Sequence, residues 1–189
     1  GAVDRLFGNR FGYGKKFEEG IMAIGTLSLA MLGIISLSPL IASALKPIIT
    51  PLYKLIGADP AMFAGTILAN DMGGYSLSIE LALSQEAGLF GGLFLAATMG
   101  ATLSFTIPVA MGIINKEDEK YLSKGIMAGI STIPFGCFFG GLIAGFNIKM
   151  LILNLIPTII FTFLICTALL KYPKAVSKSF SLFSKVMFI

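Results

Sequence analysis

The chain has 189 residues, of which 56% are hydrophobic and 13% are charged, whereas soluble domains usually carry about a quarter charged residues. It contains no histidine, which excludes a His-dependent proton relay, a His metal site and a Ser-His-Asp triad within this chain. The net charge of +4 comes from Lys and Arg residues between apolar runs. Because no basic stripe with aromatic platforms accompanies it, this charge does not indicate a nucleic-acid partner.

Four long uncharged runs predict membrane-spanning helices. A helix needs about 20 apolar residues to cross the hydrocarbon layer, and in lipid a single segment must satisfy its own backbone hydrogen bonds. The length of these uncharged runs strongly favours membrane helices over the alternative, an unusually apolar core of a soluble helical protein. The sequence therefore predicts an all-α fold, a polytopic transmembrane helix bundle in one domain over residues 1–189, with spans at about 21–45, 88–114, 125–146 and 149–170.

Between the first two spans lies an apolar stretch, 61–84, that is interrupted at its centre. The interruption reads Asn-Asp-Met-Gly-Gly over residues 70–74. Glycine permits backbone conformations that break a helix, and two short helices that meet at a polar break are a common way for transporters to build a site at mid-membrane. We predict a broken or re-entrant helical hairpin over 61–84, whose first helix begins after the helix-starting pair Asp59-Pro60.

The distribution of positive charge favours a hairpin over a fifth crossing. Cytoplasmic loops carry an excess of Lys and Arg. If 61–84 enters and leaves on one side, three of the 14 Lys and Arg residues, Lys46, Lys54 and Lys149, lie on one face and the other eleven lie on the opposite face. A single crossing would divide the positive residues five against nine, which is a weaker asymmetry.

The polar break supplies the candidate binding residues. A charged side chain inside the membrane is costly, and Asp71 is therefore a functional candidate. Asn70 adds a donor and an acceptor, Gly73 and Gly74 can expose backbone carbonyls, and Tyr75 or Phe63 could offer an aromatic face to a cation. This set favours a small cation as ligand. The secondary candidates are Glu80 and Asn154, and the sequence predicts no metal site and no cofactor.

Each candidate also has a structural interpretation, which stays open at this point. Residues 70–74 could form a surface turn with Asp71 in water, Glu80 could lie at the water boundary, and Asn154 could form an interhelical hydrogen bond.

Several longer strings resemble one known family. They are FEEGIMAIG at 17–25, GADPAMFAGT at 57–66, NDMGG at 70–74, FTIPVAMGI at 105–113 and GIMAGI at 125–130. They are similar to the ethanolamine-utilisation transporters of bacteria, and the similarity extends over nearly the whole chain. One departure is Ala69-Asn70, where the family pattern would also accept Ala-Cys; it does not affect Asp71.

The resemblance implies a permease of the bacterial inner membrane that imports ethanolamine for its catabolism. Family members are about twice as long, so the chain is expected to be an N-terminal half and to form one half of an inverted repeat. Asp71 would then pair with the ammonium group, Asn70 and the backbone near Gly73 and Gly74 would bind the hydroxyl or the remaining protons, and Tyr75 or Phe63 would close the site.

Other functions remain as alternatives to ethanolamine import. They are a secondary transporter of another small cationic or polar solute, with Asp71 as a coupling-ion site, and a structural membrane subunit that transports nothing. An intramembrane enzyme is not expected, because no catalytic pattern is present. The expected partners are ethanolamine and the lipid bilayer, with no nucleic acid; the coupling ion (proton or sodium) and a homo-oligomeric state are left open.

Overall fold

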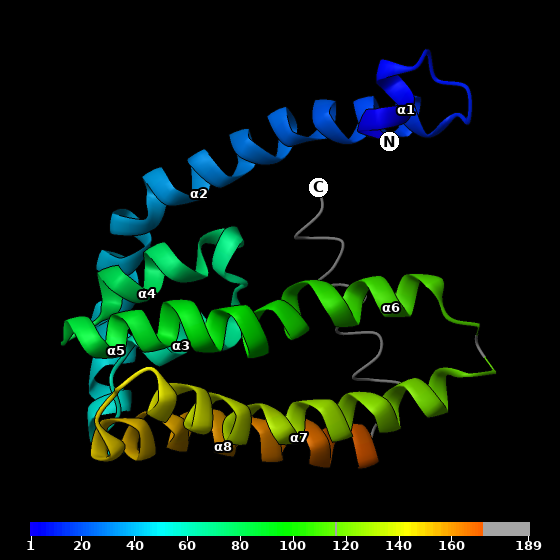
Figure 1. Cartoon of the computed structure of the whole chain (residues 1–189). Coiled ribbons are helices and arrows are strands. Elements are labelled where there is room, and N and C mark those ends of the chain that lie inside the picture. The colour runs from blue at the N-terminus through cyan, green and yellow to red at the C-terminus, as the bar shows by residue number, and fades with distance from the viewer. Residues whose placement is uncertain (116, 172–189) are drawn as a thin grey trace. The chain divides into compact units, whose positions relative to one another are not determined.

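The structure is a computed structural model that describes residues 1–115 and 117–171. These residues form helices joined by short turns, which confirms the all-α prediction (Figure 1). The chain divides into two compact units, Gly1–Leu37 and the residues from Ser38 onward, which are described separately. The helices, with η marking π-helices, are α1 Ala2–Leu6, α2 Tyr13–Leu55, α3 Ala61–Ile67, η1 Asn70–Gly74, α4 Tyr75–Leu81, α5 Gln85–Leu89, η2 Phe90–Gly100, η3 Thr102–Thr106, α6 Ile107–Ile113, α7 Glu119–Ile143 and α8 Ile148–Lys171.

The first unit begins with a small cap on helix α2. The Asp4 carboxylate accepts hydrogen bonds from the backbone N–H of Phe11 and of Gly14, both at 2.9 Å. The bond from Phe11 is the largest of the effects that lower the pKa of Asp4. Because Gly14 lies in the first turn of α2, the carboxylate satisfies one of the N–H groups that a helix start leaves free. An Arg5–Glu18 ion pair joins α1 to the second turn of α2.

Helix α2 runs further than the first predicted span. We expected a span over 21–45, but the helix continues through Pro47 and Pro51 to Leu55. Proline removes one backbone hydrogen bond, and such losses are tolerated in membrane helices where neighbouring groups satisfy the freed carbonyls. Two residues after the last residue of α2, Gly57 has φ +70°. The Gly57 N–H donates to Lys54 O, and the Ala58 N–H donates to Tyr53 O. This is a glycine-terminated helix end.

Four described helices are long and apolar enough to cross a membrane. They cover Met31–Leu55, Gln85–Met111, Lys120–Ile143 and Ile148–Lys171. The second consists of α5, η2, η3 and α6 in succession and is called the rod below. Its centre is π-helical, which the sequence did not predict. π-Helical turns are rare and occur frequently at functional sites.

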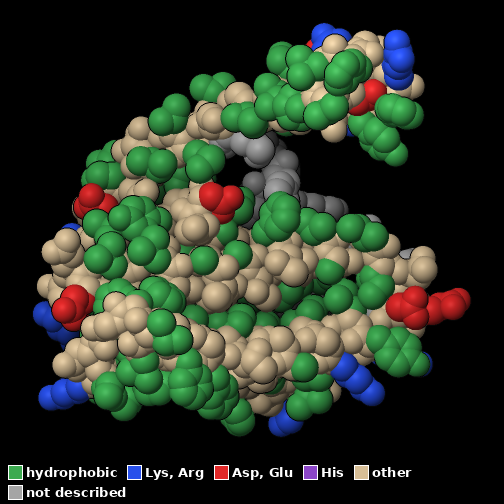
Figure 2. All heavy atoms as spheres, viewed as in Figure 1, with side chains coloured by type: hydrophobic (Ala, Val, Ile, Leu, Met, Phe, Trp, Pro, Cys, Tyr) green, Lys and Arg blue, Asp and Glu red, His purple; other side chains and the backbone are tan. Residues whose placement is uncertain are grey.

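In the second unit the core lies between the hairpin α3–α4, the rod and the pair α7–α8. Its centre includes Met62, Phe90, Leu95 and Leu151, all of which are fully buried. Helices α7 and α8 lie side by side, joined by a turn in which Gly145 has φ +87° (Figure 1). Hydrophobic side chains are spread over much of the visible surface (Figure 2), as expected for helices that face lipid.

Candidate functional site

Residues 61–81 form a hairpin of two short helices around the polar break. Helices α3 and α4 pack against each other and against the rod (Figure 1). The Ser78 hydroxyl of α4 donates to the Ala61 carbonyl of α3 at 3.1 Å and is fully buried. Each helix has seven residues, which corresponds to about 10 Å. The hairpin therefore extends only part of the way along a membrane-spanning helix.

The base of the hairpin is held together by Asp59. One carboxylate oxygen, Oδ1, accepts from Ala61 N–H at the start of α3 (2.9 Å). The other, Oδ2, accepts from Leu83 N–H and Ser84 N–H just after α4, at 3.0 and 3.2 Å. The backbone N–H of Asp59 donates to Asn154 Oδ1 of α8 at 2.6 Å. Both ends of the hairpin therefore lie at one place, beside the beginning of α8.

The tip of the hairpin, residues 68–75, contains η1 and is interrupted at Met72 and Gly73, whose backbone angles are not helical. Leu68 and Ala69 are extended, and Gly73 has φ +89°, a left-handed conformation that suits glycine. The Ala69 carbonyl accepts from Met72 N–H at 3.1 Å and from Gly74 N–H at 2.9 Å. The N–H groups of Met72 and Gly74 are therefore used within the turn and are not free to bind an anion.

The tip lies against the middle of the rod. Ala69 N–H donates to Ser104 Oγ at 3.2 Å, and the same hydroxyl donates to Gly100 O at 2.7 Å. A Cβ atom placed on Gly100 would overlap the Leu68 carbonyl oxygen, so the absence of a side chain permits this approach. Gly100 is close to the centre of the Gln85–Met111 span and Ser104 lies about one turn further on, so the tip packs against the inner part of the rod and not against its ends.

Beside the inner part of the rod, the tip presents an unpartnered carboxylate. Asn70 and Asp71 are exposed, and the Asp71 N–H donates to Asn70 Oδ1 at 2.9 Å. Within residues 1–115 and 117–171 the Asp71 carboxylate has no hydrogen bond and no ion pair. An unpaired carboxylate inside the membrane suits a cation better than an anion.

The structure brings together five of the eight candidate residues. Asn70, Asp71, Gly73, Gly74 and Tyr75 all belong to the tip, where Tyr75 is 39% exposed and its ring lies against Gly92. The two glycines are buried and shape the turn.

The other three candidates lie elsewhere in the second unit. Phe63 packs edge-on against Tyr53, with ring centroids 6.5 Å apart, and joins the cluster around Ala64 and Leu77. It is therefore not placed beside Asp71. Glu80 lies in the last turn of α4, toward the base, and Asn154 bonds to Asp59 there.

Sequence reasoning did not identify the partners that hold the tip. Ser104 and Gly100 lie in an uncharged run that predicts only a spanning helix. The signal available was the presence of small and hydroxyl residues within that run, which indicates close helix packing but does not say which segment packs there. Asp59 was expected to start α3, and it also holds the end of α4.

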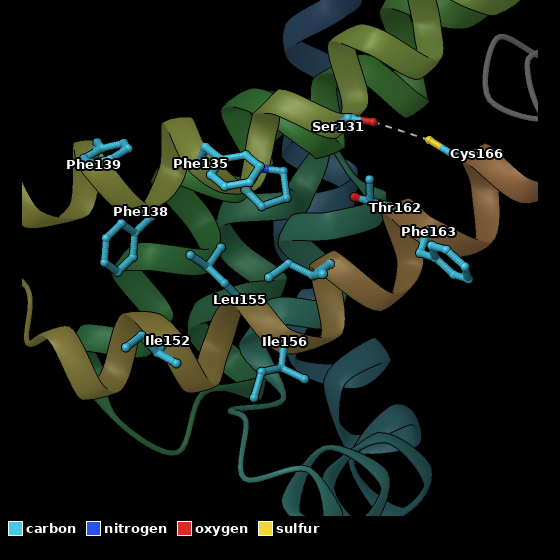
Figure 3. Close-up of a pocket in the computed structure, with 12 residues that line it drawn as sticks. Ser131, Phe135, Phe138, Phe139, Ile152, Leu155, Ile156, Thr162, Phe163 and Cys166 are labelled. Atoms are coloured by element: carbon cyan, nitrogen blue, oxygen red, sulfur yellow. Dashed lines mark hydrogen bonds between the residues drawn. The ribbon is translucent and has the colours of Figure 1, made fainter.

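A separate groove lies between α7 and α8 (Figure 3). It has a volume of about 640 Å³ and is lined mainly by Phe and Ile side chains, including Phe135, Phe139 and Phe163. The Thr162 hydroxyl in its wall is buried and has no hydrogen-bond partner. None of the lining residues is charged, so the groove lacks a counter-charge for a cation.

The comparisons with known proteins agree on one family. Residues 1–189 match the family described as "Ethanolamine utilisation protein, EutH". The chain is 56% identical over 185 residues to "Probable ethanolamine permease EutH" of Listeria monocytogenes serotype 1/2a (strain 10403S), covering 98% of this chain and 50% of that protein. It is 44% identical over 189 residues to the protein of the same name in Escherichia coli (strain K12), covering 93% of this chain and 46% of that protein.

A third relative is named only by its gene. "Uncharacterized protein YxeR" of Bacillus subtilis (strain 168) is 49% identical over 187 residues, covering 99% of this chain and 50% of that protein. The chain thus spans about half the length of the curated relatives it matches. No solved structure matches it. With four helices suited to crossing a membrane, the chain is part of a multi-pass membrane protein, and it belongs to the EutH family of ethanolamine utilisation proteins.

Proposed function

We propose that the chain forms part of a permease that carries ethanolamine across the bacterial inner membrane, and that the hairpin tip contributes to its substrate site. The names of the relatives supply the solute. Ethanolamine is protonated at neutral pH and carries an ammonium group and a hydroxyl. It is therefore a small cation that needs a counter-charge and a polar partner.

The observation that carries the proposal is the depth of Asp71. The tip that bears this residue lies against Gly100, near the middle of the rod, and is bonded to Ser104 one turn further on. A charged side chain at the centre of a bilayer costs about 2.5–3.5 kcal/mol or more unless it is paired or faces a water-filled cavity. Because Asp71 is exposed and unpartnered among the described residues, a protonated amine at this position would supply the missing charge.

The remaining tip residues have defined roles in this proposal. Tyr75 places an exposed aromatic ring beside the turn, where it can contact the ammonium group from the side. Gly73 and Gly74 keep the turn narrow. Phe63, Glu80 and Asn154 are assigned no contact with the solute, because they pack or bond away from the tip.

The proposal is tested by uptake of labelled ethanolamine into proteoliposomes that contain the full-length protein. Loss of the charge in Asp71→Asn removes a hydrogen bond between two charged groups, which is worth about 1.5–3 kcal/mol. We expect the KM for ethanolamine to rise about tenfold to a hundredfold, or saturable uptake to disappear.

The matched control is Asp118→Asn, which removes a carboxylate that is exposed and makes no side-chain capping bond before α7. Its uptake should equal that of the wild type. Wild-type kinetics in Asp71→Asn would remove the tip from the site. Absence of ethanolamine uptake by the wild type would reject the substrate, and competition by other small amines would then identify the cation that is carried.

A further inference from the structure

We propose that Asn70 makes the site selective for amino alcohols over simple alkylamines, by donating a hydrogen bond from its Nδ2 atom to the hydroxyl oxygen of the solute. This inference rests on the proposed function, because it names the feature of the substrate that the same site recognises.

The orientation of the Asn70 side chain follows from a single bond. Its Oδ1 accepts from the Asp71 N–H at 2.9 Å. An N–H group can bond only to the oxygen of the amide, so the bond fixes which atom is Oδ1 and which is Nδ2. The Nδ2 group carries two donor hydrogens, and it makes no hydrogen bond to any residue in 1–115 or 117–171. Since Asn70 is exposed, these donors are available to a ligand.

Few other donors of the tip are available. The backbone N–H groups of Ala69, Asp71, Met72 and Gly74 are bonded to Ser104 Oγ, Asn70 Oδ1 and, for the last two, Ala69 O. The Asn70 amide is an exposed donor on the residue next to Asp71. An acceptor for an ammonium group and a donor for a hydroxyl oxygen on adjacent residues match the two ends of an amino alcohol.

Three solutes distinguish this arrangement from simple cation binding. Ethanolamine has a hydroxyl that can accept or donate, 2-methoxyethylamine has an oxygen that can only accept, and ethylamine has no oxygen. If Nδ2 donates to the solute, both oxygen-containing amines should compete with labelled ethanolamine about tenfold more strongly than ethylamine does, which corresponds to one net hydrogen bond.

The Asn70→Asp variant exchanges the donor for an acceptor and retains an oxygen for the Asp71 N–H. In the full-length protein it should keep its preference for ethanolamine over ethylamine, because the hydroxyl can donate to the new carboxylate. It should lose its preference for 2-methoxyethylamine, which would then compete no better than ethylamine. 2-Methoxyethylamine and ethylamine carry the same charge. The ratio of their strengths as competitors therefore cancels the effect of the added negative charge.

Two further variants separate recognition from structure. Asp118→Asn, which removes an exposed carboxylate outside the hairpin, should leave all the ratios unchanged. Asp71→Asn should weaken the three amines together, without altering their ratios. The melting temperature of each purified variant shows that it is folded. If Asn70→Asp does not fold, Asn70→Ala replaces it; this variant removes both the donor and the acceptor of the side chain and should lower both preferences to about one.

Three results would overturn the inference. They are a wild-type protein that takes up ethanolamine but binds ethylamine equally well, a wild type that rejects 2-methoxyethylamine as strongly as ethylamine, and a folded Asn70→Asp protein with wild-type ratios. Each is distinct from failure of the proposed function, in which the wild type takes up no ethanolamine.

Discussion

Gly100 sets how closely the hairpin tip can approach the rod. A Cβ atom added there would overlap the Leu68 carbonyl oxygen and would lie 2.8 Å from the Gly65 carbonyl oxygen. Both are backbone atoms, which cannot move aside as a flexible side chain would. In Gly100→Ala we expect the tip to shift, with a loss of stability of about 1–3 kcal/mol and a reduced rate of ethanolamine uptake. Thermal unfolding and uptake of the purified full-length protein measure the two effects.

Gly129→Ala in α7 is the control for this substitution. An added Cβ there has no neighbour within 4 Å, and alanine is a better helix former than glycine. This variant should be at least as stable as the wild type. Equal stability of Gly100→Ala and Gly129→Ala would show that the tip does not depend on the close approach at Gly100.

Individual residues differ in how far the sequence alone reveals their role. Asp71 could be named as a candidate because a carboxylate within an apolar stretch has a physical cost that local sequence shows directly, and its role stays a prediction. Phe63 could not be placed, since an aromatic residue seven positions before the break can turn toward the tip or toward Tyr53. Ser104 binds Ala69 across 35 positions of sequence, and no local pattern indicates such a pairing.

Among the helical elements, the hairpin depends on one carboxylate at its base. Asp59 is buried and accepts three backbone hydrogen bonds, from Ala61, Leu83 and Ser84. Removing it in Asp59→Ala leaves these N–H groups without partners, each at a cost of about 1–3 kcal/mol where it stays buried. We expect faster hydrogen exchange at Leu83 and Ser84 and a lower melting temperature, with Asp59→Asn intermediate because it keeps one acceptor oxygen.

Hydrogen–deuterium exchange of peptides covering 59–84 provides this measurement. Glu86→Gln, which alters an exposed carboxylate nearby, should exchange as the wild type does. Wild-type protection in Asp59→Ala would mean that the helices α3 and α4 hold their ends together without the carboxylate.

The boundaries of the helices show what apolar patterns can and cannot specify. Uncharged runs predict that helices are present, because lipid leaves the backbone few alternatives. They do not specify that α2 continues through Pro47 and Pro51, since this depends on how the freed carbonyls are satisfied. Nor do they reveal the π-helical turns of the rod, which change the hydrogen-bond register without changing composition.

For the molecule as a whole, the hairpin determines which loops share a side of the membrane. Both of its ends meet at Asp59, so residues before and after it should face the same aqueous phase. In a cysteine-free background we expect single cysteines at Ile56, Glu86 and Ala144 to react with an impermeant maleimide from one side, and a cysteine at Asp118 to react from the other. All four positions are exposed.

The alternative topology gives a different labelling pattern. If residues 61–84 crossed the membrane, the cysteines at Ile56 and Glu86 would react from opposite sides. The asymmetry of Lys and Arg predicts the hairpin arrangement from sequence, and the labelling experiment tests that prediction independently of the coordinates.

The position of the tip also has an electrical consequence. Moving one elementary charge across a membrane potential of 100 mV changes its energy by about 2.3 kcal/mol. A monovalent cation that binds at Asp71, at the mid-depth proposed for the tip, crosses about half of that potential and so exchanges about 1.2 kcal/mol with the field. Occupancy of a site at Asp71 would therefore change about sevenfold for each 100 mV at constant solute concentration, so that voltage acts on the binding step itself.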